Sequence, residues 1–298
     1  MVLKTIGITG GSGLLGSHLL YFFSKKKIKI IATYRKKIPF KNINIKWVKC
    51  DLKKLSSIKS ISKTFIGIDF LILNAATTES KNKKFYKNND ISSTRTMSQW
   101  CIKNKTPLAY ISGSIVYKKA DEAVSESHPF SKKPAGSEYG LSKIICEKII
   151  KEERANGLKA MILRPTSIYG LGLKNNKLLN RLRNEILSSN LVKINLSNHK
   201  MNFIHARDIA NGIYRLIKKN RFSDFNFAYK KSYTIKEIIS KISNYYKKKP
   251  KIIDSKMLLN KTHIQYKLNS TKLAKSVKWT PKISLDKGLK MMIKKRYY

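Results

Sequence analysis

Short apolar runs alternate with helical patterns along the first half of the chain. The runs are rich in valine, isoleucine and leucine and lack alternating polar positions, which is typical of strands covered on both faces. They predict six strands, at residues 4–9, 28–33, 45–50, 70–73, 108–112 and 160–164. Strands separated by helices in this way indicate repeated β-α-β units, and therefore an α/β protein built on a parallel sheet.

The pattern loosens after residue 170. A basic helical pattern covers 178–187, and two later segments, 235–246 and 285–293, have the spacing of amphipathic helices. An apolar run at 225–228 predicts a last strand that returns to the sheet. We therefore expect one domain at 1–170, completed by 203–228, and a smaller C-terminal lobe, formed by 171–202 and 229–298, that binds substrate.

A glycine turn, Gly10-x-x-Gly13-x-x-Gly16, joins the first strand to a helix expected over 14–23. Gly10 would permit the sharp turn, Gly13 would let the backbone approach a pyrophosphate, and Gly16 would let the helix pack closely on the strand. The diphosphate would lie at the helix N-terminus. The strand before the turn and the helix after it make the signal specific. We predict a Rossmann-type, doubly wound dinucleotide-binding domain whose cofactor contacts Gly10, Ser12, Gly13, Leu14, Leu15 and Gly16.

The end of the second strand bears on which dinucleotide is bound. An acidic residue about 20 positions after the turn would bind the ribose 2′-hydroxyl and select NAD. The chain has Thr33-Tyr34-Arg35 there instead, and a guanidinium can pair with the 2′-phosphate of NADP. NADP(H) is therefore modestly favoured over NAD(H). The alternative is that Arg35 is one more solvated charge in a very basic chain.

Charge is the most unusual property of the composition. The chain has 63 Lys and Arg against 17 Asp and Glu, a formal net charge of +46, as in proteins that bind nucleic acids or anionic surfaces. The lysines are spread over all segments, so we interpret them as a compositional drift on solvated faces and expect no nucleic-acid partner. A dedicated polyanion site is the alternative.

Other compositional features narrow the class of protein. No apolar run approaches the roughly 20 residues needed to cross a bilayer, and the first residues are expected to form a strand rather than a signal peptide. We therefore expect a cytoplasmic protein. The three cysteines are widely spaced, without the Cys/His pairing that a metal requires, so no metal is expected. A homodimer is compatible with the sequence.

A tyrosine and a lysine stand four residues apart in a helix predicted to run toward Asn156-Gly157. Because positions four apart share a helix face, the Tyr139 phenol and the Lys143 ammonium would point into the same space. A fixed cation beside a phenol favours the phenolate, which makes Tyr139 a candidate general acid/base. Lys143 would also hold the nicotinamide ribose. A chance pair on a helix is the alternative, since this spacing is common.

An ordered series of motifs resembles the extended short-chain dehydrogenase/reductase family, in its NAD-dependent epimerase/dehydratase group. The likeness runs nearly end to end. It consists of the glycine turn from Thr9, Asp51-Leu52, Asn74-Ala75-Ala76, Asn89 with Thr94, the segment 111–117, the Tyr139/Lys143 pair, Leu163-Arg164-Pro165 within 163–170, the segment 203–210 and Trp279-Thr280-Pro281.

The resemblance implies roles for several of these residues. Tyr139 would be the acid/base, Lys143 its electrostatic partner, and a strand-five hydroxyl would orient the substrate oxygen. A hydride would pass between a sugar carbon and the nicotinamide while Tyr139 moves the hydroxyl proton. The remaining residues implied to contact or support the cofactor are Asp51, Leu52, Asn74, Ala75, Ala76, Asn89 and Pro165.

The chain departs from the family at two points. The usual serine or threonine falls on Gly113, which leaves Ser112 and Ser114 on either side; we favour Ser114 as the substitute, and a missing hydroxyl with weak turnover is the alternative. The Asp-Glu pair typical of the dehydratases is replaced by Ser114 and Ile115. Dehydration is therefore disfavoured, and epimerisation or reduction of a keto-sugar remains.

The sequence thus predicts an NAD(P)-dependent oxidoreductase or epimerase that acts on a nucleotide-activated sugar. The rival interpretation is a non-catalytic relative that senses a cofactor or binds RNA, which the high positive charge would suit. Such relatives tend to lose the Tyr139/Lys143 pair, and this chain retains it. Two further residues are assigned structural roles: a partly buried, hydrogen-bonded His205 and a Trp279 that packs in the second lobe.

Overall fold

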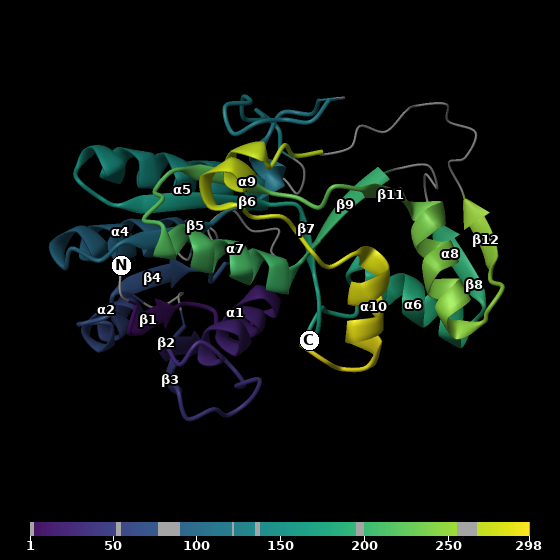
Figure 1. The fold of residues 1–298 in the computed structure, drawn as a ribbon, viewed down its shortest axis with the longest axis horizontal. Helices are drawn as coiled ribbons and strands as arrows, with labels where there is room; N and C mark the ends of the chain where they lie inside the picture. The colour runs from purple at the N-terminus through teal and green to yellow at the C-terminus, as the bar shows by residue number, and fades with distance from the viewer. Residues whose placement is uncertain are drawn as a thin grey trace.

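The computed structural model describes residues 3–51, 55–76, 90–120, 122–134, 138–194, 200–254 and 267–297. Two parts lie side by side in Figure 1, a larger one built on a central sheet and a smaller one that contains α6 (Leu178–Ser188), α8 (Ile235–Tyr246) and β12 (Lys251–Asp254).

The central sheet has seven parallel strands in the order β10-β6-β5-β4-β1-β2-β3. The chain starts inside the sheet with β1, builds outward to the edge strand β3, and then returns past β1 to β4. This reversal is the doubly wound arrangement, in which ligands bind outside the carboxyl ends of the strands. The strands are β1 (Thr5–Ile8), β2 (Lys29–Tyr34), β3 (Ile45–Lys49), β4 (Phe70–Leu73), β5 (Leu108–Ile111), β6 (Ala160–Pro165) and β10 (Asp224–Phe227).

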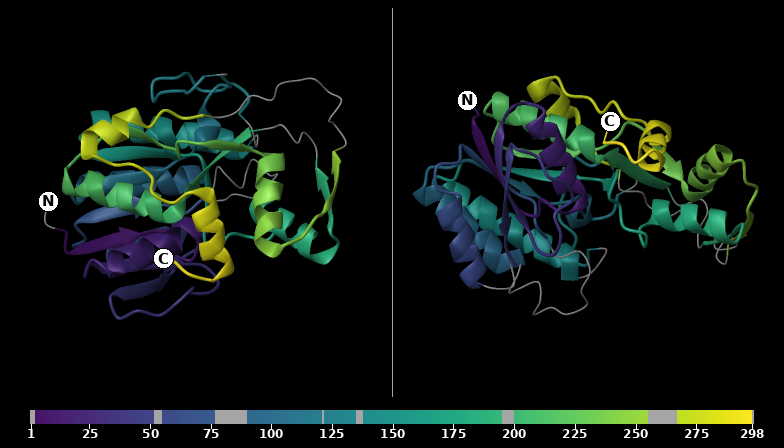
Figure 2. Two further views of the ribbon diagram at one scale, coloured as in Figure 1. Left: turned by 45° about the vertical axis from the view of Figure 1, so that its right-hand side comes forward. Right: turned by 90° about the horizontal axis from the view of Figure 1, so that it is seen from below.

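Helices cover both faces of this sheet (Figure 2). One face carries α1 (Leu14–Ser24), α7 (Ala206–Lys218) and α9 (Thr271–Val277), and the other carries α2 (Leu55–Thr64), α4 (Ser92–Lys103) and α5 (Glu138–Ala155). Two separate apolar clusters fill the spaces between the sheet and these layers. The predicted fold class is confirmed, including the strand at 225–228 that returns to the sheet beside β6.

The smaller part has an apolar core of its own, which includes Leu182, Phe203 and Ile238. Its strands form two short sheets, β11-β9-β7 and β12-β8. The elements are β7 (Ser167–Tyr169), α6 (Leu178–Ser188), β8 (Leu191–Ile194), β9 (Lys200–His205), β11 (Ser232–Thr234), α8 (Ile235–Tyr246), β12 (Lys251–Asp254) and α10 (Leu285–Ile293). The predicted limits of α8 and α10 are confirmed, and the exact division of the chain into two domains stays a prediction.

The prediction for Trp279 is wrong. Its ring packs edge-on against Phe227 of the large sheet, and its Nε1 donates a hydrogen bond of 3.0 Å to the Asp208 carbonyl of α7. The indole therefore lies in the apolar cluster beneath α7, together with Leu273 of α9. Gly212 explains the placement, because a Cβ there would collide with the Phe227 ring and approach the indole to 3.0 Å. The absence of a side chain at Gly212 leaves a gap beside α7, and the Trp279 indole fills it.

Two further observations concern membranes and metals. None of the helices in the described part of the chain combines the length and apolar character needed to span a membrane. All three cysteines are buried and free, and no metal-binding cluster of His, Cys, Asp and Glu occurs among the described residues.

Candidate active site

Backbone geometry explains two glycines of the turn after β1. Gly10 has a φ of +67°, and a Cβ on it would lie 2.8 Å from the Ala75 Cα. A side chain on Gly16 would overlap the Gly10 carbonyl oxygen and press on Gly11. Gly10 is therefore required by conformation and by the close approach of Ala75, and Gly16 by the packing of α1 on the turn.

Gly13 differs from these two glycines because it faces open space. A Cβ there would touch only the Gly10 oxygen, at 3.4 Å, and both Ser12 and Gly13 are exposed. Gly13 precedes α1 as its N-cap, and none of the described side chains caps the helix there. The first amides of a helix have no partner within it, and the helix dipole favours an anion at this end. The turn therefore has the donors and the free approach that a diphosphate needs.

Two threonine hydroxyls hold this turn against the neighbouring strands. The Thr9 Oγ1 accepts hydrogen bonds from the backbone amides of Asn74 and Ala75, both at 3.0 Å. The Asn74 side chain in turn donates to the carbonyls of Thr9 and Gly10. On the other side, the Gly10 amide donates to the Thr33 Oγ1 at 2.9 Å. The carboxyl ends of β1, β2 and β4 are thus locked together around the turn.

The remaining predicted cofactor residues also follow carboxyl ends of parallel strands, which meet at one edge of the sheet. Arg35 is exposed directly after β2, and Asp51 follows β3. Ala76 continues the segment after β4, and Pro165 is the last residue of β6. Leu14 and Leu15 open α1. Two predicted residues, Leu52 and Asn89, lie outside the described residues.

Lys143 is fixed within the site by several contacts. Its side chain is buried, at 3% exposure, and its Nζ donates a hydrogen bond of 2.8 Å to the carbonyl of Ile111, the last residue of β5. The same Nζ lies 5.7 Å from the Tyr139 ring centroid and 4.8 Å from that of Tyr110. The structure thus places Tyr139 and Lys143 on one face of α5, beside the carboxyl end of β5.

The segment after β5 contains the two candidate hydroxyls. Ser112 is buried at 4% exposure, and its Oγ donates a 2.5 Å hydrogen bond to the Glu147 carboxylate. Ser114 is partly exposed and opens the short 3₁₀ helix η2 (Ser114–Val116), which contacts α5. At Gly113 a Cβ would meet only the Ile115 side chain at 3.8 Å and the Pro165 carbonyl at 3.9 Å. Because Glu147 engages Ser112, this geometry favours Ser114 as the residue that can reach a substrate.

Behind this segment lies a buried ion cluster that the sequence interpretation did not include. The Arg164 guanidinium, on β6, donates to both Glu147 carboxylate oxygens, to Asp224 and to the Tyr117 hydroxyl. Glu147 and Arg164 are fully buried. Burial alone would raise the pKa of Asp224, but Arg164 and Arg154 hold that pKa below its ordinary value. In the sequence, Glu147 follows Lys143 by four residues, and this i,i+4 spacing was the sign that both side chains lie on the same face of α5.

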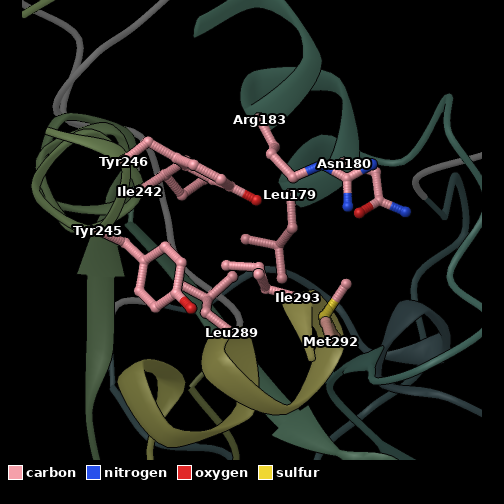
Figure 3. Close-up of a pocket in the computed structure, with 9 residues that line it drawn as sticks. All are labelled: Leu179, Asn180, Arg183, Ile242, Tyr245, Tyr246, Leu289, Met292 and Ile293. Atoms are coloured by element: carbon pink, nitrogen blue, oxygen red, sulfur yellow. The ribbon is translucent and has the colours of Figure 1, made fainter. Parts of the chain in front are cut away.

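A small hollow in the second part of the molecule lies apart from these residues. Helices α6, α8 and α10 enclose it (Figure 3), and its cavity volume is about 10 Å³. That volume holds at most about one water molecule, so the hollow is too small for a substrate. Its lining residues are Leu179, Asn180, Arg183, Ile242, Tyr245, Tyr246, Leu289, Met292 and Ile293.

Solved structures of similar fold cover nearly the whole chain. MoeE5 in complex with UDP-glucuronic acid and NAD is 19% identical, with 98% of each chain covered and a TM-score of 0.86. A variant of UDP-glucuronic acid 4-epimerase from Bacillus cereus, in complex with UDP-4-deoxy-4-fluoro-glucuronic acid and NAD, is 22% identical, with 98% of each chain covered and a TM-score of 0.86. The dTDP-glucose 4,6-dehydratase from Bacillus anthracis, in complex with NAD, is 19% identical over 98% of this chain and 96% of that one, with a TM-score of 0.85. At these identities the likeness shows the fold.

Comparison with curated proteins yields no match. The sequence model of the NAD-dependent epimerase/dehydratase family, in contrast, matches residues 6–230, which include the glycine turn, the Tyr139/Lys143 pair and the segment after β5. With three quarters of its length matched, this chain belongs to the NAD-dependent epimerase/dehydratase family.

Proposed function

We propose that the protein is an NAD(P)-dependent enzyme that epimerises a nucleotide-activated sugar or reduces a keto-sugar. The single observation that carries the proposal is the position of Lys143. Its buried ammonium is anchored to the end of β5 and lies beside the Tyr139 ring, at the sheet edge where the glycine turn can take a diphosphate. A site of this composition can bind a dinucleotide and move a proton next to it.

Each residue has a defined part in this chemistry. A bound nicotinamide would accept or return a hydride. Tyr139 would take the proton of the reacting sugar hydroxyl as that carbon is oxidised, and would return it when the carbonyl is reduced. Lys143 would stabilise the phenolate through its positive charge, and it would donate to the nicotinamide ribose. Ser114 would donate a hydrogen bond that orients the sugar oxygen.

The substrate class is supported by similar folds. MoeE5 and the Bacillus cereus epimerase variant were solved with UDP-sugars. Ser114 and Ile115 stand where dehydratases of the family carry their acidic pair, so this chain lacks the groups that would add and remove the protons of water. A net charge of +46 would attract a nucleotide diphosphate over a long range at low ionic strength.

The choice between NAD and NADP depends on the end of β2. Solved structures of similar fold contain NAD. No acidic residue stands at the end of β2 in this chain, and Arg35 is exposed there, so a modest preference for NADP(H) remains our prediction. Arg35→Ala should weaken NADP(H) binding selectively, by roughly tenfold, because one charge-assisted contact is lost. Equal losses for both cofactors in calorimetric titrations would refute the contact.

The decisive experiment compares Tyr139→Phe with the wild type. UDP-sugars that differ at C4 and C5 would be incubated with each dinucleotide, and epimers and reduced products would be separated by chromatography. We expect Tyr139→Phe to abolish turnover while dinucleotide binding remains, because only the proton-transfer group is lost. Tyr214→Phe, a partly exposed tyrosine on α7, is the matched control and should keep full turnover.

The same experiment tests the rival interpretation. Unchanged turnover in Tyr139→Phe would refute the assigned role. A wild-type protein that converts no UDP-sugar but binds RNA tightly, with affinity falling steeply as salt rises, would favour a non-catalytic RNA-binding protein.

A further inference from the structure

Glu147 of α5 and Arg164 of β6 form a buried ion pair that contacts the residue directly after β5. Arg164 contacts the Glu147 carboxylate at 2.6, 2.9 and 3.1 Å, and its remaining donors reach Tyr117, Asp224 and the Glu126 carbonyl. The guanidinium therefore has partners on every side. The Glu147 Oε1, which accepts from the Arg164 Nε, also accepts from the Ser112 hydroxyl.

The Ser112 contact makes α5 hold the last residue of β5 and the residue that follows it. Lys143 donates to the Ile111 carbonyl, and Glu147, one helical turn later, accepts from Ser112. These two residues immediately precede Gly113 and Ser114. The Ser112 amide also donates to the Leu163 carbonyl at 2.8 Å, so the Glu147 contact adds a side-chain anchor to a backbone anchor immediately before Gly113 and η2.

We propose that Glu147, backed by Arg164, is a positioning residue that acts through Ser112 to set Ser114 against the Tyr139/Lys143 pair. The proposal rests on the proposed function. It assigns Ser112 no contact with substrate, because that hydroxyl is buried and donates to the carboxylate.

Stability alone is a weaker explanation of the cluster. A buried ion pair costs so much desolvation that well-packed apolar residues of similar volume often serve as well. Here the charged groups converge on the segment after β5, which contains the candidate hydroxyls. Tyr117, at the far end of η2, is held by the same cluster, since its hydroxyl accepts from Arg164 and donates to the Asn226 side chain at 2.7 Å. Both ends of the Ser114 segment are thus attached to one buried ion cluster.

The main variant is Ser112→Ala, because it removes the Glu147 contact and leaves the ion pair intact. Ser98→Ala is the matched control: Ser98 is also buried, and it donates a 2.7 Å hydrogen bond to the Thr94 carbonyl within its own helix, α4, rather than to the ion cluster. Ser112→Thr keeps the hydroxyl and should restore the wild-type behaviour of the η2 segment. Glu147→Gln is a second variant, used only where its thermal unfolding shows that it folds.

The first readout is amide hydrogen exchange in the whole protein, which needs no substrate. The amides of Val116 and Tyr117 donate to the Gly113 and Ser114 carbonyls at 3.4 and 3.2 Å, so they report on η2. We expect exchange of these amides to rise about tenfold in Ser112→Ala, with α4 unchanged, and to return in Ser112→Thr. The second readout is kinetics, where Ser112→Ala should lower kcat about tenfold with KM unchanged.

The outcomes separate the proposal from the proposed function. Unchanged exchange at η2 in Ser112→Ala overturns the positioning role, whatever the kinetics, and a fall in kcat without a change in exchange would mean that Ser112 contacts substrate itself. Faster exchange in Ser112→Ala, combined with no turnover of any UDP-sugar by the wild type, supports the positioning role and removes the proposed function. If Ser98→Ala accelerates exchange at η2 as much as Ser112→Ala does, the loss of any buried hydroxyl loosens the fold, and the proposal is overturned.

Discussion

Two buried histidines make the folded state sensitive to acid. His18 on α1 and His205 at the end of β9 lie edge to face, with ring centroids 5.2 Å apart, and neither is more than 2% exposed. Burial lowers the pKa of His18 to about 4 and, with the repulsion of His18, that of His205 to about 3. The His205 Nδ1 accepts from the Arg207 amide, which leaves Nε2 as the protonated nitrogen, and Nε2 has no hydrogen-bond partner among the described residues.

The sign of the effect follows from these shifts. Both pKa values are lower in the folded state than the ordinary value of about 6.5, so below that pH the unfolded chain binds more protons. The contribution of the two neutral histidines to the free energy of unfolding is therefore complete above about pH 6.5, and it is lost as the pH falls toward 4 and 3. At pH 5 each histidine lies about 1.5 pH units below its unfolded pKa, which corresponds to about 2 kcal/mol, or about 4 kcal/mol for the pair.

Urea unfolding at pH 8 and pH 5 measures this loss. Between pH 8 and pH 5, the free energy of unfolding of His205→Asn should fall by about 2 kcal/mol less than that of the wild type. Asparagine does not titrate, and it can still accept from the Arg207 amide at the start of α7. His128→Asn, at a partly exposed site, controls for the general effect of removing a histidine from a highly charged chain. An acid-induced loss as large in His205→Asn as in the wild type would refute the reasoning.

Four glycine substitutions give further predictions. Gly16→Ala should cost about 3 kcal/mol in urea unfolding, because its Cβ would overlap the Gly10 carbonyl, whereas Gly13→Ala should unfold like the wild type. In calorimetry, however, Gly13→Ala should weaken dinucleotide binding by at least about tenfold, since the new methyl faces the site. Gly113→Ser should leave the unfolding free energy within about 0.5 kcal/mol and raise kcat about tenfold, because the site has room for a hydroxyl there. Gly288→Ala should destabilise by about 2 kcal/mol although alanine favours helices, because its Cβ would collide with the Tyr169 ring; thermal unfolding tests this. Wild-type unfolding of Gly16→Ala or Gly288→Ala, wild-type dinucleotide affinity of Gly13→Ala, or an unchanged kcat in Gly113→Ser would contradict the respective prediction.

The sheet could be predicted from the sequence because its strands are buried on both faces. Such strands read as uninterrupted apolar runs, and 70–73 matches β4 residue for residue. The strands of the smaller part, β7, β8, β9, β11 and β12, were not predicted. All of them except β9 have only three or four residues, and Ile252 and Ile253 of β12 are substantially exposed, so burial leaves no periodic signal in that strand. The placement of Trp279 could not be predicted either, because it depends on the gap at Gly212, 67 residues earlier, that only the packed structure brings beside it.

Local motifs predicted the groups of the site, but not what holds them. The turn and the Tyr139/Lys143 pair each lie within a single stretch of sequence, where a spacing has a direct geometric meaning. Ser112, Glu147 and Arg164 come from three elements, and nothing in their spacing shows that one carboxylate joins them. The sequence favoured Ser114 over Ser112 as the substitute for the hydroxyl missing at Gly113, and the contact with Glu147 adds a structural reason, because it engages the Ser112 hydroxyl within the fold. Gly113→Ser would then add a second donor beside Ser114, and either hydroxyl could orient the same substrate oxygen. Ser114→Ala should then abolish most turnover in the wild type and cost much less in the Gly113→Ser background, a non-additivity that two independent sites would not show.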